Sequence, residues 1–123
     1  MPDEPRASQL RQEITRLTTE RAAVERELMR RRRMLAASLV ERHLGTRQHK
    51  RESAAFYLSW ARAGRTHLLY VAKDRLGEVR PAVDAWRTFR AALRRWRDLS
   101  ERIEVLWRSL GEAQAQSPEE LTP

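Results

Sequence analysis

The basic side chains between residues 46 and 77 carry the clearest chemical signal in the chain. This stretch holds seven arginines and lysines against two acidic residues, a net charge of +5 within a total of +8. Unbalanced positive charge in a loop is better evidence of contact with an anion than a charged helix, whose signs usually alternate. The alternative is a solvated basic turn. The candidate phosphate contacts here are Arg47, Lys50, Arg51, Arg62, Arg65, Lys73 and Arg75.

A second set of arginines recurs every seven residues farther along the chain. Arg80, Arg87 and Arg94 lie on one side of an expected helix, opposite its apolar residues. Such a row can follow a phosphate backbone, and it is equally typical of the outer face of a coiled coil. Both interpretations stay open, and the three arginines join the candidate nucleic-acid contacts.

Two tyrosines, Tyr57 and Tyr70, are candidates for base stacking. The surrounding residues predict a β-hairpin that places both rings on the same face. Aromatic rings stack on the bases of single-stranded nucleic acids. Packing of the two rings against each other across the hairpin is the commoner role, so stacking is the second of the two interpretations.

No combination of residues predicts catalysis or a cofactor. The three histidines, His43, His49 and His67, show no spacing of metal ligands, and the absence of cysteine excludes disulfides and thiolate metal sites. The carboxylates are scattered among arginines at the spacing of helix ion pairs, without a nucleophile elbow or a glycine-rich phosphate loop. We therefore expect no catalytic residue, no bound metal, no cofactor and no enzyme activity.

Length and composition fit one small domain with a highly charged surface. The chain has 123 residues, of which 41% are apolar and 34% are charged, and its pI is about 11.2. This charge favours an anionic partner, although arginine-rich usage can also follow from the base composition of the coding DNA. No apolar run reaches the roughly 20 residues of a membrane span, and the first residues lack the apolar core of a signal peptide. We expect a cytoplasmic protein.

Residues 8–44 are predicted to form the first of two long helices. Apolar residues alternate in steps of four and three along this segment, and Arg21 and Arg31 occupy two positions of the same stripe. Ser8 is the expected N-cap, and Gly45 is the expected stop.

The run LMRRRRML, residues 28–35, falls inside this predicted helix. Four consecutive residues of a helix cover most of its circumference, so the arginines cannot all face one phosphate backbone. Arg31 would lie in the apolar stripe between Leu28 and Leu35. We interpret the run as a local defect in a coiled-coil seam.

The stretch AFYLSWARAGRTHLLYVAK predicts a β-hairpin that turns at Ala63 and Gly64. A lone hairpin is marginally stable in water, so it must pack on a helix or meet another copy of itself. The more apolar face should pack inward. On that face, pairing across the turn places Phe56, Leu58 and Trp60 opposite Val71, Leu69 and His67.

A second long helix is predicted after the hairpin. Asp74 is a candidate N-cap for a short turn, Pro81 should precede the main helix, and Gly111 should end it. Its apolar residues repeat about every 3.5 positions, as in a left-handed coiled coil. The predicted fold class is mainly α: two long helices form an antiparallel coiled-coil-like pair, with one β-hairpin inserted between them. The domain should span residues 8–110, between disordered tails at 1–7 and 111–123.

The segments YLSWARAGRTHLLYV and AWRTFR resemble an uncharacterised bacterial family that is often found near mobile genetic elements. Its members have a helix, a β-hairpin with a Gly-basic-Thr turn and a second helix. Many also carry a cysteine cluster before the hairpin, which this chain lacks. The resemblance implies the order of the elements and a mobile-element setting, without an activity. It rests on Ser38, Leu39, Tyr57, Leu58, Gly64, Arg65, Thr66, Tyr70, Val71, Trp86, Arg87, Phe89 and Arg90.

Two functions from different classes follow from these observations. The first is a small basic accessory protein that binds DNA or RNA through the loop and hairpin of residues 46–77. The second is a coiled-coil module that forms a homodimer through the long helices or recruits a protein partner. The unbalanced charge of residues 46–77 favours the first, because a coiled-coil module has no need of it.

Overall fold

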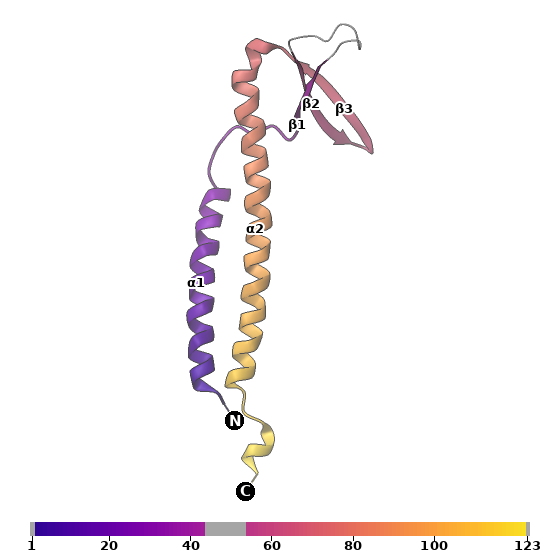
Figure 1. The fold of residues 1–123 in the computed structure, drawn as a ribbon. Coiled ribbons are helices and arrows are strands. Elements are labelled where there is room, and N and C mark those ends of the chain that lie inside the picture. The colour runs from indigo at the N-terminus through magenta and orange to yellow at the C-terminus, as the bar shows by residue number, and fades with distance from the viewer. Residues whose placement is uncertain (1, 44–53, 123) are drawn as a thin grey trace. The chain divides into compact units, whose positions relative to one another are not determined.

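The structure, a computed structural model, describes residues 2–43 and 54–122. The elements follow in the order α1 (Glu4–Leu28), β1 (Ser38–Arg42), β2 (Ala55–Arg62), β3 (Arg65–Val71) and α2 (Leu76–Gln114), with short 3₁₀ turns at Lys73–Arg75 and Pro118–Leu121 (Figure 1). The predicted fold class is confirmed: the chain is mainly helical, with β structure between two long helices. The β structure is a three-stranded antiparallel sheet, not a lone hairpin.

The chain divides into two compact units that share α2. One unit, the helical unit, comprises the residues up to 30 and those from 91 onward. The other, the sheet unit, comprises residues 31–90 and includes the three strands and the first turns of α2. The predicted domain limits of 8–110 lie inside the two long helices, because α1 begins before residue 8 and α2 ends after residue 110.

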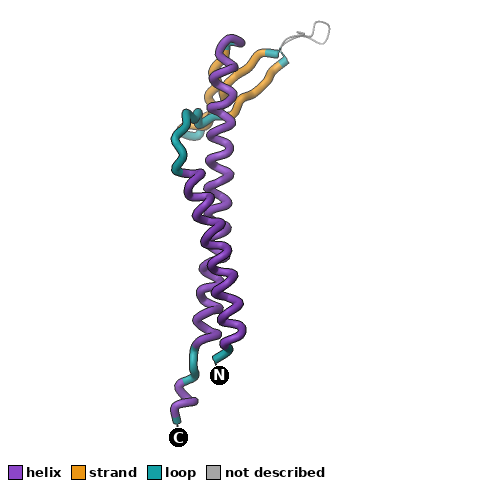
Figure 2. Tube along the Cα trace, turned by 90° about the vertical axis from the view of Figure 1, so that its left-hand side faces the viewer, coloured by secondary structure: helices purple, strands orange, loops and turns teal. Residues whose placement is uncertain are grey.

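In the helical unit, α1 and the last part of α2 run antiparallel and side by side (Figures 1 and 2). The buried residues of α1 follow steps of seven, three and seven, the spacing of a coiled-coil seam. They pack in two clusters against the seam of α2, which confirms the predicted antiparallel pairing. The buried residues are Ala7, Ile14, Leu17 and Val24 of α1 and Leu99, Ile103, Leu110 and Ala113 of α2.

Polar groups flank this apolar seam. Arg95 of α2 donates a hydrogen bond to Glu20 of α1 across the pair, with nitrogen and oxygen 2.8 Å apart. Arg21, which was predicted to occupy a stripe position, is partly buried and donates to the hydroxyl of Ser100 at 3.3 Å. Arg21 is thus a polar group within the seam, and such a group favours one alignment of the two helices over others.

The first helix begins at Glu4, so the prediction of Ser8 as its N-cap is wrong. Asp3 caps the helix: its carboxylate accepts a hydrogen bond from the backbone N–H of Arg6 at 3.0 Å. Pro5 lies in the first turn, where a backbone N–H has no helical partner, so its missing N–H costs the helix nothing. The first turn is also held by tertiary contact, because Ala7 is fully buried against the end of α2.

The first helix ends at Leu28, so the prediction of one helix over residues 8–44 is also wrong. Residues 30–33 are arginines and offer no apolar side chain to the seam. Because they lie beyond the end of the helix, the interpretation of this run as a defect in a coiled-coil seam is wrong. Beyond them, the chain joins the sheet unit. The N–H of Leu35 donates to the carbonyl of Ala82 at 3.0 Å, and β1 pairs with β2.

The sheet has the strand order β1-β2-β3, and the predicted hairpin register is confirmed. Tyr57 pairs with Tyr70, and the turn lies at Ala63 and Gly64, whose φ angles are 51° and 75°. Two positive φ angles are typical of the tight turn that matches the twist of a hairpin. The predicted inward face packs inward in part: Leu58 and Val71 are buried against Val79 and Val83 of α2, whereas Leu69 of the same face is 55% exposed.

The second helix is continuous from Leu76 to Gln114, with Pro81 inside it. The prediction that Pro81 precedes the main helix is therefore wrong, as is the prediction that Gly111 ends it. Both ends of the helix are stabilised by tertiary contacts, which the local sequence does not indicate. Val79 and Val83 on either side of the proline are buried against the sheet, and Ala113 beyond the glycine is buried against α1.

Replacement of Leu17 by alanine tests the seam of the helical unit. Among residues 2–43 and 54–122, Leu17 is the one large side chain that is less than 2% exposed. We expect Leu17→Ala to lower the free energy of unfolding by about 2 to 4 kcal/mol, because the lost burial leaves a cavity. Urea denaturation followed by circular dichroism measures the change. Thr18→Ala, at the exposed neighbouring position, should change stability by less than about 0.5 kcal/mol. A similar small effect at Leu17 would contradict the assigned seam.

Candidate nucleic-acid interface

The face of the sheet that points away from the buried cluster is open to solvent. Side chains alternate along a strand, so the residues between those of the buried face share the opposite one. On this open sheet face, Leu68 and Tyr70 are 45% and 59% exposed. The face carries Ser38, Val40 and Arg42 of β1, Tyr57, Ser59 and Ala61 of β2, and Thr66, Leu68 and Tyr70 of β3.

Two aromatic rings and a guanidinium group lie next to one another on the open sheet face. The ring centroids of Tyr57 and Tyr70 are 5.7 Å apart in an edge-to-face arrangement. The guanidinium carbon of Arg42 lies 5.6 Å from the Tyr57 centroid. An aromatic ring supplies a stacking surface for any base, and an adjacent guanidinium group supplies a positive charge for phosphate. The predicted pairing of the tyrosines across the hairpin is confirmed; base stacking stays a prediction.

The tip of the hairpin concentrates positive charge. Arg62 and Arg65 are direct cross-strand partners on either side of the two-residue turn. Both are exposed, and neither forms an ion pair with another residue that the structure describes. Like charges placed directly opposite each other destabilise a hairpin. An anion bound at the tip would remove this repulsion, so the arrangement suits phosphate binding.

Two other predicted phosphate contacts have carboxylate partners inside the sheet unit. Arg75 donates its Nε–H to Glu78 at 2.5 Å, and Arg87 lies 3.9 Å from Asp84. Their positive charge is therefore partly balanced, and they are weaker candidates than Arg62 and Arg65.

The remaining candidates are dispersed. Arg80 lies over the ring of Phe56, with its guanidinium carbon 5.5 Å from the ring centroid. Lys73 lies in the 3₁₀ turn before α2, and Arg94 belongs to the helical unit. Three predicted contacts lie outside the described residues: Arg47, Lys50 and Arg51.

Glu78 is the acidic centre of a small ionic cluster at the start of α2. Besides Arg75, it accepts a hydrogen bond from Arg33 at 3.1 Å. These two arginines, Arg75 more than Arg33, hold the pKa of Glu78 below its ordinary value. A carboxylate in the first turn of a helix is also favoured by the helix dipole. The cluster ties the segment after α1 to the helix and thereby supports the sheet unit.

Sequence reasoning missed Arg42, because its residues were assigned to the first helix. The stretch SLVER has two adjacent apolar residues, a pattern that occurs in a strand and in a turn of helix alike. The pattern therefore does not predict a strand. Its strand structure depends on pairing with β2, a partner distant in the sequence. No local signal for Arg42 as part of this face was present.

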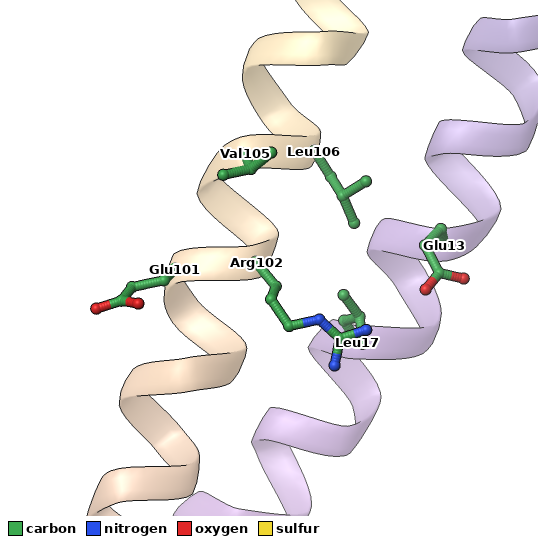
Figure 3. A pocket seen from close by; sticks show the side chains of 6 residues that line it. All are labelled: Glu13, Leu17, Glu101, Arg102, Val105 and Leu106. Carbon is green, nitrogen blue, oxygen red and sulfur yellow. The ribbon is translucent and has the colours of Figure 1, made fainter.

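The helical unit has an open apolar groove beside the seam, of about 380 Å³. Figure 3 shows that Glu101 points away from it, whereas Arg102 extends toward α1 near Leu17. On the α1 side, the hydrogen bond from Arg16 lowers the pKa of Glu13, and Arg102 adds a smaller effect of the same sign. These charges form a solvated ionic rim. They do not converge on a point where a reacting atom could bind.

Titratable residues elsewhere do not gather into a reactive cluster. In residues 2–43 and 54–122, no group of three or more histidines and carboxylates could hold a metal ion. Two histidines have local contacts: His43 lies 3.6 Å from Glu41, and the ring of His67 stacks on Trp60 at 5.5 Å. Neither helix, over the residues described, is apolar enough along its length to cross a lipid bilayer.

The ionic cluster at Glu78 should make stability depend on pH. A carboxylate whose pKa is lowered by folding stabilises the protein above its unfolded pKa, and this contribution is lost as the pH falls through the lowered folded value. We expect the wild type to be more stable than Glu78→Gln at neutral pH, and the difference to shrink below about pH 4. Thermal melting between neutral and acidic pH measures it. As a control, Glu101→Gln removes a carboxylate of α2 that forms no ion pair with a described residue; an equal effect there would refute the assignment.

Comparison with known proteins yields no matching family model, no matching curated protein and no matching solved structure. Function must therefore be inferred from the geometry of the interface itself, and the resemblance to an uncharacterised bacterial family stays a prediction.

Proposed function

We propose that this protein binds single-stranded DNA or RNA through the open sheet face and the hairpin tip. The observation that carries the proposal is the Tyr57–Tyr70 pair on the open sheet face, in which Tyr70 is exposed, Tyr57 is half-buried and Arg42 lies beside the Tyr57 ring. Arg62 and Arg65 add positive charge at the end of the same hairpin. Stacking platforms beside basic residues are the usual means of binding unpaired bases. Bases inside a duplex are stacked on each other and cannot reach such rings.

The dimensions of the hairpin fit a short stretch of nucleic acid. A strand rises about 3.3 Å per residue, so the five-residue step from Tyr57 to Arg62 spans roughly 16 Å. Arg62 is in phase with Leu58 and Trp60 and pairs with Arg65, so both arginines leave the sheet on the face opposite the tyrosines. A nucleic-acid strand stacked on the tyrosines would reach these arginines by passing around the end of the hairpin.

The charge distribution supports the same surface. The stretch from residue 46 to residue 77 holds most of the net charge of the chain, and the two arginines of the tip have no acidic partner among the described residues. In the helical unit, by contrast, several arginines are paired with glutamates, such as Arg16 with Glu13 and Arg95 with Glu20. Positive charge is thus available for a partner at the hairpin more than at the helices.

The alternative function is a coiled-coil module that binds a protein partner or a second copy through the helices. The exposed Val105 and Trp107, 59% and 56% accessible, lie on α2 next to the seam and favour it. This function would leave the unpaired charge of the hairpin tip without a role, so we rank it second. A role beside a mobile genetic element, as an accessory protein, is supported by the family resemblance alone.

Removal of the hairpin charge tests the electrostatic part of the proposal. We expect Arg62→Ala combined with Arg65→Ala to weaken binding of a single-stranded oligonucleotide several-fold to about tenfold near physiological salt, and to reduce the slope of log affinity against log salt by about two. Fluorescence anisotropy across a salt series measures both quantities. The matched control, Arg26→Ala with Arg108→Ala, removes the same charge from the helical unit. An equal loss in the control would show that net charge acts without a defined site.

Removal of an aromatic ring tests the stacking part. We expect Tyr70→Leu to weaken binding by about 1 to 3 kcal/mol, since a stacked base contributes that much, and to leave the salt slope unchanged because no charge is removed. Tyr70→Phe keeps the ring and should bind like the wild type. If Tyr70→Leu binds as tightly as Tyr70→Phe, the tyrosines serve the hairpin alone. No binding of any single-stranded nucleic acid by the wild type at low salt would refute the proposed function as a whole.

A further inference from the structure

Among the residues that the structure describes, β3 forms an edge of the sheet, and its own sequence lacks the usual protection against pairing. Natural edge strands are short, charged or bulged. The other edge, β1, fits this rule: it has five residues and includes Glu41 and Arg42. In contrast, β3 has seven residues in continuous register with β2, without a proline or a bulge, and a single charge at its first residue. Its exposed side chains include Leu68, Leu69 and Tyr70.

The backbone of β3 presents hydrogen-bonding groups on its free side. Alternate residues of an antiparallel strand direct their N–H and C=O groups to opposite sides. Arg62 and Arg65 close the two-residue turn, so every second residue of β3 from Arg65 onward bonds to β2. The groups of Thr66, Leu68 and Tyr70 therefore point away from the sheet.

We propose that the free edge of β3 pairs antiparallel with β3 of a second copy of this chain, about a two-fold axis at Leu68. Residue 68 is the midpoint of the strand, so this register pairs all seven residues. Leu68 meets Leu68 of the second copy, Thr66 meets Tyr70, His67 meets Leu69, and Arg65 meets Val71. In this register, the backbone groups of Thr66, Leu68 and Tyr70 form their hydrogen bonds with the same three residues of the second copy.

Charge selects this occupant and this register. The strand is self-complementary because its one charged residue, Arg65, meets Val71 and not a second cation. A shift of the axis by one residue, to Leu69, would leave Arg65 without a partner in the strand, because β3 ends at Val71, and would bring it toward Lys73 of the following turn. Apart from Arg65, the strand contains no arginine, lysine or acidic residue, so two chains of high positive charge can approach at this edge.

Pairing through β3 would satisfy the backbone groups of its free side and bring the exposed Leu68 side chains of the two copies together. Because the two-fold axis would run perpendicular to the sheet, the tyrosine pairs of both copies would face the same side.

The mass in solution tests this pairing. Analytical ultracentrifugation of the full chain at micromolar concentration, without nucleic acid, should give twice 14.5 kDa. Leu68→Lys places two cations at the axis, so we expect it to return the mass to that of a monomer. The matched control Val105→Lys changes an exposed apolar residue of the helical unit and should remain dimeric. A monomeric wild type, or loss of the dimer in the Val105→Lys variant alone, would overturn the proposal.

Cross-linking gives a second test that does not depend on destabilising the protein. The chain contains no cysteine, so Leu68→Cys introduces a single thiol at the proposed axis. Antiparallel partners lie at a distance that a disulfide can bridge. Mild oxidation should cross-link Leu68→Cys into a dimer and leave Trp107→Cys, in the helical unit, monomeric on a denaturing gel. Cross-linking of Trp107→Cys without that of Leu68→Cys would assign the contact to the helices and refute pairing through β3. Neither experiment uses nucleic acid. A negative result would therefore refute pairing through β3 without bearing on the proposed nucleic-acid binding.

Discussion

The packing of the sheet against the first turns of α2 is the contact on which the rest of the sheet unit depends. Leu58 and Val71 are buried against Val79 and Val83. A small sheet is stable only when one apolar face is covered, and α2 covers this one. Because side chains alternate along a strand, the same contact determines which face stays open. The tyrosine pair lies on the uncovered face for this reason, with Tyr70 exposed and Tyr57 half-buried.

The same contact explains why the first long helix stops where it does. Leu35 and Leu39 pack against the buried cluster of the sheet unit, and the backbone between them leads into β1. If residues 29–42 had continued the helix, these leucines would have packed only in the narrow helical seam. The strand β2 would then have had no partner on that side. Four arginines, without an apolar side chain among them, separate the two packing environments. The break thus follows from competition between two apolar clusters for nearby residues.

The two units use charge in different ways. Across the helical seam, glutamates and arginines lie opposite each other, as between Glu20 and Arg95, which favours one alignment of the helices. At the hairpin tip, Arg62 and Arg65 lie opposite each other without an acidic partner among the described residues. Local features that oppose stability tend to mark functional positions. The contrast between the units is the physical basis for assigning an anionic partner to the hairpin.

The sequence by itself determined the features that arise from contacts near in the chain. Alternation around Ala63 and Gly64 predicted the hairpin register and the shared face of Tyr57 and Tyr70, and the spacing of apolar residues predicted the antiparallel seam. The tertiary structure alone decided the third strand, and with it the place of Arg42 beside the tyrosines and the status of β3 as an edge. Pairing of β1 with β2 is the physical reason: its backbone hydrogen bonds join residues far apart in sequence, and local periodicity carries no record of them.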